Sequence, residues 1–261
     1  MSMPAWQPRW IGAPGQALYA GMHPAPDAGV GVVLAPPLLH EQPRSRRVLL
    51  EIARRLAGCG VTVLRFDYFG TGDSDGRGGQ HDFAAMAADF DAVVAALHED
   101  TGIARVGVLA WGAAALPAAA WAARRDDIAA LALWEPVADG ASWLAALEAA
   151  DRAERAARYA PAQAQPDPGE LMGYPVSPRW RADFAQARLA APVAVPLWTI
   201  ARAGAALAPS AARRFELPAD APRFDGGVAI ERTVFLSRAL FGLVEQLGRA
   251  FAALEAEHAD A

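Results

Sequence analysis

Two short segments of the chain have the spacing that serves a catalytic serine. Residues 72–76 read Gly-Asp-Ser-Asp-Gly, the pattern in which hydrolases hold a serine nucleophile on a sharp strand-to-helix turn, the nucleophile elbow. Glycines and polar residues follow this segment, where an elbow requires a helix. Residues 105–116 do have the strand-turn-helix order, but Gly112 stands at the nucleophile position. A glycine adopts the strained backbone of such a turn at no steric cost, and it cannot attack a substrate.

The partners of an elbow serine are also missing at their usual places. Hydrolases of this kind carry serine, acid and histidine in that chain order, with the histidine accepting the serine proton and the acid orienting the histidine. After the predicted strand at 192–200 there is no carboxylate before Glu216. Glu135, after an earlier strand, is an alternative acid. The one histidine after residue 98 is His258, close to the end of the sequence.

Ser74 acting with another base is a further hypothesis. His40 follows a neighbouring strand and could approach Ser74 or Gly112 at the edge of the sheet, whereas His81 lies on a Gly-rich loop. The threonine and aspartates around Ser74 favour a different role, because such side chains stabilise turns by hydrogen bonding to nearby backbone. The catalytic candidates are therefore His40, Ser74 and Glu135, and we expect Ser74 to be structural.

Phosphate and metal sites fit this region poorly. A phosphate-binding loop leads directly into a helix and avoids acids, yet residues 70–76 contain two aspartates. The spacing of the acidic residues at 67, 73, 75 and 82 does not match a calcium-binding EF-hand loop, which ends on a bidentate glutamate. We expect no metal and no cofactor. Cys59, the single cysteine, excludes an internal disulfide and is interpreted as a small buried residue.

The order of predicted elements indicates an α/β fold. Two short strands lie within 5–24. Continuous apolar runs, typical of strands buried on both faces, occur at 29–35, 61–66, 106–110, 128–134 and 192–200, and a last strand or edge segment lies within 215–230. Helical patterns occur at 44–57, 83–99, 113–123 and 232–257. This alternation predicts a mostly parallel central sheet with helices on both faces.

Between 138 and 190 the pattern changes. Helical stretches at 142–159 and 178–189 flank a loose Pro- and Gln-rich stretch at 161–169. We interpret 138–190 as a helical cap inserted over the strand ends, with residues 1–137 and 191–261 as the core. Ligands of such sheets bind beyond the carboxyl ends of the strands. The predicted ligand-binding residues are Leu38, Leu39, His40, Trp111, Gly112 and Glu135. Tryptophans at 111, 134, 143 and 180 suit an apolar or sugar-like ligand, and core packing explains them equally well.

Residues 65–76, Arg-Phe-Asp-Tyr-Phe-Gly-Thr-Gly-Asp-Ser-Asp-Gly, resemble a loop of α/β hydrolases of the serine aminopeptidase/lysophospholipase type. In those proteins the loop is structural and precedes the true elbow. More narrowly, the chain resembles the hydrolases associated with the exosortase A system of bacteria. The segments that carry this second resemblance are Ala-Pro-Pro at 35–37 with Ser-Arg-Arg at 45–47, residues 133–140 and residues 173–178.

The resemblance covers roughly residues 15–190. It implies an α/β-hydrolase fold in a bacterial protein whose gene is linked to exopolysaccharide production and protein sorting. It also implies that residues 36–41 supply a backbone N–H to an oxyanion hole beside the elbow. One branch of the exosortase-linked hydrolases also lacks the elbow serine. Because Gly112 and the vacant acid and histidine positions depart from the family pattern, the fold does not determine the function.

Composition restricts the partners of this protein. The 261 residues are 54% hydrophobic and carry a net charge of −5, which gives no indication of a nucleic-acid partner. Neither a signal peptide nor a membrane-spanning run is evident, so we expect a cytoplasmic protein.

Two functions remain open. We favour a non-catalytic protein that binds a small molecule; the alternative is a hydrolase or acyltransferase for an ester, thioester or amide that uses non-standard residues. A homo-oligomer or a protein partner also remains open.

Overall fold

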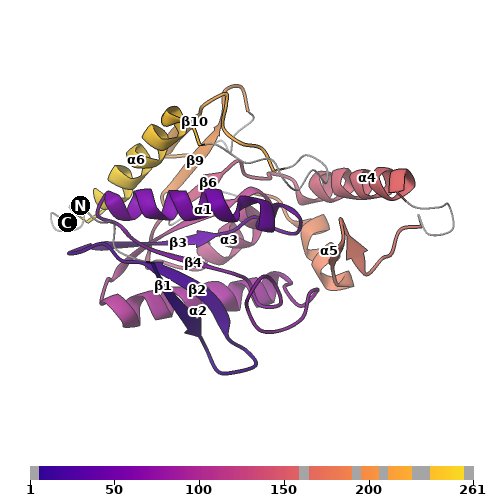
Figure 1. Cartoon of the computed structure of the whole chain (residues 1–261), viewed down its shortest axis with the longest axis horizontal. Helices are drawn as coiled ribbons and strands as arrows, with labels where there is room; N and C mark the ends of the chain where they lie inside the picture. The colour runs from indigo at the N-terminus through magenta and orange to yellow at the C-terminus, as the bar shows by residue number, and fades with distance from the viewer. Residues whose placement is uncertain (1–5, 159–164, 190–194, 206–210, 225–235, 256–261) are drawn as a thin grey trace.

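A sheet of eight strands runs through the centre of the computed structural model, which describes residues 6–158, 165–189, 195–205, 211–224 and 236–255 (Figure 1). The strand order is β1-β2-β4-β3-β5-β6-β9-β10. The strands are β1 (Gln7–Ile11), β2 (Leu18–His23), β3 (Val30–Ala35), β4 (Thr62–Phe66), β5 (Arg105–Trp111), β6 (Ile128–Trp134), β9 (Leu197–Arg202) and β10 (Arg213–Leu217). Only the β1–β2 and β2–β4 pairs are antiparallel. The predicted mostly parallel sheet is therefore confirmed.

Helices cover both faces of this sheet, as predicted. They are α1 (Glu41–Gly58), α2 (Phe83–Thr101), α3 (Ala115–Ala122), α4 (Gly140–Arg158), α5 (Pro178–Gln186) and α6 (Arg238–Ala252). One core cluster joins α1 and α6 to Val30, Val32 and Leu34 of β3. A second cluster joins α2 and α3 to Val33 and Ala35 of the same strand. The alternating sides of β3 thus serve two separate cores, which is why its sequence is apolar throughout.

Several predicted boundaries were wrong, each for a local reason. Helix α1 begins at Glu41 instead of residue 44, because Pro43 is tolerated in a first helical turn, whose N–H groups have no partner within the helix. The turn before α3 is a short 3-10 helix at Gly112–Ala114. Helix α5 stops at Gln186, since Ala187 is extended. Parts of the segments predicted at 161–169, 192–200, 215–230 and 232–257 lie outside the described residues.

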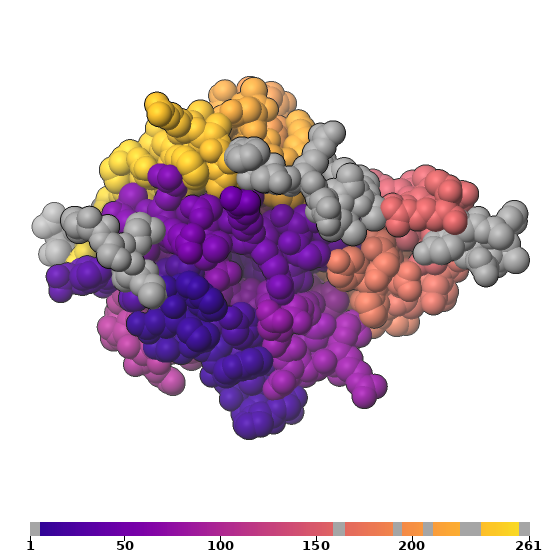
Figure 2. Space-filling model, viewed as in Figure 1, coloured from indigo at the N-terminus to yellow at the C-terminus, as the bar shows by residue number. Residues whose placement is uncertain are grey.

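The segment between β6 and β9 contains α4, α5 and a small hairpin of β7 (Glu170–Leu171) and β8 (Tyr174–Pro175) that the sequence did not predict. The hairpin turns at Met172 and Gly173, both with positive φ. Helices α4 and α5 lie together at one end of the molecule, on the right of Figures 1 and 2. Among the described residues no helix is long and apolar enough to cross a membrane.

The loop after β4 is held in place by three acceptor side chains. The Asp67 carboxylate accepts hydrogen bonds from Gln42 Nε2 at 3.0 Å, from the Asp73 backbone N–H at 3.0 Å and from Arg46 Nη2 at 3.2 Å. Ser74 Oγ accepts from a β2 backbone N–H at 2.9 Å and donates to the Asp67 carbonyl at 2.6 Å. Asp75 accepts from two N–H groups of the β1–β2 turn. The loop therefore ties α1 to the antiparallel edge of the sheet.

Substituting Gly72 with alanine should disrupt this loop. The residue has a φ of 55°, and an added Cβ would lie 2.1 Å from Asp67 Oδ2. Because the left-handed backbone and the overlap both oppose a side chain, Gly72→Ala should lower the free energy of unfolding by about 2–3 kcal/mol in urea titrations.

Gly242→Ala is the matched control, because a Cβ at this α6 position meets no atom within 4 Å. It should raise the free energy of unfolding by about 0.5–1 kcal/mol, the difference in helix propensity between glycine and alanine. Equal effects of the two substitutions would contradict the packing described for the loop.

Candidate functional site

Gly112 forms a tight turn directly after the central strand β5. Its φ is 59°, in the left-handed region, and the chain then enters the 3-10 helix and α3. The Gly112 carbonyl accepts a hydrogen bond from the Val137 N–H at 3.1 Å, which joins the turn to the segment after β6. An added Cβ would meet one atom within 4 Å, Glu41 Oε2 at 3.4 Å. The turn has the geometry of an elbow and carries no side chain.

A cleft of about 400 Å³ opens over this turn. We call it the elbow cleft. The strand ends contribute Trp111, Gly112 and Glu135, and the start of α1 contributes Glu41. Helix α4 adds an apolar wall that includes Trp143 and Leu147, and Arg223 and Phe224 close the opposite side. Among the described residues lining the cleft there is no hydroxyl, thiol or imidazole side chain.

Glu135 lies in the elbow cleft with its charge already paired. Its Oε1 accepts from Arg202 Nε at 2.7 Å, and both side chains are largely buried. Arg202, the last residue of β9, also donates from Nη2 to the Ala221 carbonyl at 2.9 Å. Glu135 has a φ of 43°, which is uncommon for a residue with a side chain. This ion pair lies at the carboxyl ends of β6 and β9. A catalytic acid was considered after both of these strands in the sequence.

Glu41 is the residue that sequence reasoning did not select. It opens α1, where an acid is favoured by the helix dipole, and it directly follows the loop at 36–40. Glu41 is distant from Gly112 in sequence, but in the fold its carboxylate approaches the Gly112 turn. An acid in the first turn of a helix was the only sequence signal, and it is too common to single out this residue.

None of the described histidines is among the residues that line the elbow cleft. His40 is buried immediately before α1. His81 is buried beside Trp180 and lines a different cavity, of about 410 Å³, together with Leu39. His23 Nε2, on β2, accepts from Arg65 Nε at 3.0 Å. His98 lies in the last turn of α2, where its Nδ1 is 2.6 Å from the Ile103 carbonyl oxygen. His258 lies outside the described residues.

The structure thus separates the residues that the sequence grouped together. Trp111, Gly112 and Glu135 line the elbow cleft, and Leu39 lines the cavity that contains His81. Leu38 is buried in the core cluster that includes α2 and α3 and lines neither cavity. Ser74, in the loop after β4, uses its hydroxyl both to accept a hydrogen bond from one backbone group and to donate one to another. The stacking of Trp111 on Trp134, with ring centroids 4.7 Å apart, shows that much of the Trp111 ring belongs to the core.

Burial changes the acid–base properties of three groups outside the elbow cleft. It lowers the pKa of His81 to about 4, with the Asp82 charge opposing the shift. Burial, with a further contribution from the Arg65 charge, also lowers the pKa of His23 to about 4. Burial raises the pKa of Asp89 to about 6, against a hydrogen bond from the Phe69 N–H. Both histidines are therefore neutral at physiological pH.

The described ranges contain no group of three or more His, Cys, Asp or Glu side chains that could hold a metal ion.

Comparison with known proteins identifies the family. The sequence model of the serine aminopeptidases of the S33 type matches residues 38–170. The chain belongs to this family of α/β hydrolases. Among curated proteins, none matches the chain. Because the matched residues include the loop at 65–76, the resemblance to α/β hydrolases of the serine aminopeptidase type that was inferred from this loop is confirmed.

Solved structures share the α/β-hydrolase fold at low sequence identity. Est1E from Butyrivibrio proteoclasticus, solved with ferulic acid, is 18% identical, with a TM-score of 0.53 over 74% of this chain and 77% of that chain. The Pyrococcus furiosus esterase Pf2001 is 15% identical, with a TM-score of 0.51 over 76% and 70%. The bottromycin epimerase BotH, in complex with bottromycin A2, is 20% identical, with a TM-score of 0.56 over 95% and 98%.

His81 should make the fold sensitive to acid. Its pKa is 6.5 in the unfolded chain and about 4 in the fold, so between these values the unfolded chain binds more protons. Stability should be complete above this window and fall as the pH decreases through it. His81→Asn should reduce the loss of unfolding free energy between neutral pH and about pH 5 by about 1–2 kcal/mol.

Urea titrations of both proteins across this range measure the difference. Asp89 acts in the opposite direction, since its pKa is higher in the fold, but it is present in both proteins and cancels. Identical pH dependence of the wild type and His81→Asn would contradict the neutral, buried state of this ring.

Proposed function

We propose that this α/β-hydrolase-family protein binds a small molecule in the elbow cleft without forming a covalent intermediate. The observation that carries the proposal is the bare turn at Gly112, where the family pattern requires a nucleophile. Covalent catalysis needs a nucleophile within hydrogen-bonding reach of a base. The described residues lining the cleft include two carboxylates and an arginine, and none of them is a conventional nucleophile–base pair.

The walls of the elbow cleft suit an apolar, acyl or sugar-like ligand with one polar end. Trp143 and Leu147 of α4 and Phe224 provide apolar and aromatic surface. Glu41 and the exposed Arg223 provide charge. Residues 138–190 act in this proposal as a cap, because α4 supplies one wall of the cleft. Asp139 fixes the start of that helix by accepting from the Ser142 N–H at 2.7 Å and pairing with Arg188.

A hydrolase or acyltransferase with non-standard residues is the alternative, and Glu41 is the observation that favours it. Its Oε2 lies 3.4 Å from the position of a Cβ on Gly112, close to where a reacting group would sit in an active relative. A carboxylate there could act as a general base on a water molecule that attacks an ester, thioester or amide. Glu135 lies in the same cleft and is paired with Arg202.

The biological context of the proposal rests on the sequence. The segments at 35–37, 45–47, 133–140 and 173–178 support a link to bacterial exopolysaccharide production and the exosortase A system. A cytoplasmic location, the absence of a cofactor, and a homo-oligomer or protein partner remain predictions. BotH, an epimerase, shares the fold with the two esterases, which supports the view that this fold does not prescribe ester hydrolysis.

Binding and turnover of p-nitrophenyl butyrate separate the two functions. We expect the ester to bind without release of nitrophenolate. Ala146→Trp should abolish binding, because Ala146 is an exposed residue of α4 that lines the cleft. Ala149→Trp, at an exposed position of the same helix that does not line the cleft, should leave binding unchanged.

Binding is measured by isothermal titration calorimetry and turnover by nitrophenolate absorbance. Turnover that is lost in Glu41→Gln and retained in Ser74→Ala would replace the non-catalytic proposal with the alternative. Equal binding to both tryptophan variants would show that the ester does not occupy the elbow cleft.

A further inference from the structure

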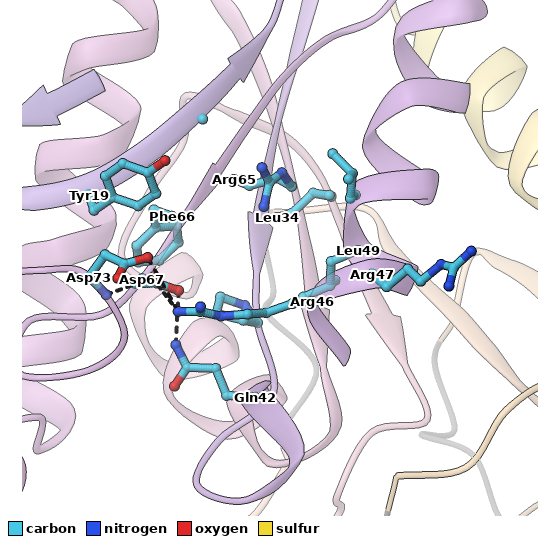
Figure 3. A pocket seen from close by; sticks show the side chains of 13 residues that line it. Tyr19, Leu34, Gln42, Arg46, Arg47, Leu49, Arg65, Phe66, Asp67 and Asp73 are labelled. Carbon is cyan, nitrogen blue, oxygen red and sulfur yellow. Dashed lines mark hydrogen bonds and ion pairs between the residues drawn. The ribbon is translucent and has the colours of Figure 1, made fainter. Parts of the chain in front are cut away.

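A third cavity, of about 270 Å³, lies on the α1 side of the sheet between α1, β2 and β4 (Figure 3). It shares no lining residue with the elbow cleft. Its apolar surface includes the buried side chains of Leu34, Leu49 and Phe66. Arg65 reaches this surface from β4, next to Leu34 in Figure 3. We call it the Arg65 cavity.

Arg65 carries a half-buried charge and forms no direct ion pair with the described residues. Its Nε donates to His23 Nε2 at 3.0 Å, and its guanidinium carbon lies 5.9 Å from the centre of the Trp6 ring. In the described part of the chain, no carboxylate oxygen lies within ion-pair distance of this guanidinium. Burial lowers the pKa of Arg65, and the nearby charge of Asp67 opposes this shift.

His23 orients Arg65 without compensating its charge. A histidine nitrogen that accepts a hydrogen bond must carry a lone pair, so the ring is neutral. Burial and the Arg65 charge lower the pKa of His23 to about 4, which maintains this state at neutral pH. Gly21 contributes space, because a Cβ there would lie 3.0 Å from Arg65 Nη2. The hydrogen bond to His23 therefore holds the guanidinium against β2, and the absence of a side chain at Gly21 leaves room for it.

The other charges of the cavity are paired with one another. Arg46 forms ion pairs with Asp67 at 3.2 Å and Asp73 at 3.6 Å, and Figure 3 shows it extended toward both. Asp67 also accepts from Gln42. Arg47 points away from this group in Figure 3. Arg65 is therefore the cation that remains available to a ligand.

We propose that the Arg65 cavity binds a small monocarboxylate with a short apolar tail. A guanidinium recognises a carboxylate through parallel N–H···O bonds, which also stabilise a poorly solvated charge. The tail would contact Leu34, Leu49 and Phe66. The nearby Asp67 and Asp73 carboxylates disfavour a dianion, so inorganic phosphate should bind more weakly.

Calorimetric titration of the full chain with sodium hexanoate at neutral pH tests this site, with acetate and inorganic phosphate as comparisons. Hexanoate should bind most tightly of the three. Arg65→Met should weaken hexanoate binding by about tenfold or more, because it keeps the apolar stem and removes the fork of donors. Arg9→Ala removes an exposed arginine of β1 that pairs with Asp100, and should leave binding unchanged.

Two further variants keep the test decisive. Leu50→Trp, at a half-buried α1 position, fills the Arg65 cavity without changing its charge and should abolish hexanoate binding. Ala146→Trp, which blocks the elbow cleft, should not affect it. Arg65→Met should also unfold at an equal or higher urea concentration than the wild type, because a half-buried charge without a direct ion pair has been removed.

Three results would overturn the proposal. They are absence of hexanoate binding to the wild type, equal binding to the wild type and Arg65→Met, and tighter binding of phosphate than of hexanoate. A loss of hexanoate binding in Ala146→Trp with none in Leu50→Trp would place the ligand in the elbow cleft. The outcome is independent of the ester experiment, since the two cavities share no residue.

Discussion

The left-handed turn at Gly112 is the constraint around which the rest of the site is arranged. Strand β5 pairs with β3 and β6, so its carboxyl end emerges in the middle of the sheet. The chain must reverse there within one residue to start α3, and glycine reaches the required φ of 59° without strain. The Val137 N–H fixes the turn from the segment after β6. The carboxylate of Glu41 then faces a turn that carries no side chain, and the cleft above it stays open.

The charges around this turn form an arrangement suited to binding. Glu135 and Arg202 neutralise each other across the ends of β6 and β9, and further backbone carbonyls hold Arg202. Such a largely buried pair is costly to break, so it forms a fixed part of the cleft wall. The loop after β4 contributes to the fold and supplies no reactive group, because Ser74 and Asp67 both bond to its backbone. In this account the family scaffold is retained and its covalent chemistry is absent.

Periodicity and turn residues were sufficient to predict the sheet, most helices and the glycine at the elbow. The sequence pattern placed the start of α1 too late, because Pro43 lies inside its first turn. It also did not predict the two-residue strands on either side of the turn at Met172 and Gly173. Local signals could not predict the pairing of Glu135 with Arg202 or the approach of Glu41 to Gly112, since each joins residues that only the folded topology brings together. The lack of a direct ion pair at Arg65 in the described structure is likewise visible only in three dimensions, because Asp67 lies two residues away in sequence and pairs with Arg46 instead.

Exposure to a fluorophosphonate probe followed by intact-mass spectrometry tests the central claim most directly. The reagent reacts with an activated serine whichever residue carries it, so it does not presuppose a site. We expect the mass of the protein to remain unchanged, because the elbow has no hydroxyl and the Ser74 hydroxyl is bonded to backbone. A stoichiometric adduct that disappears in Ser74→Ala, or one that maps to any other serine, would contradict it.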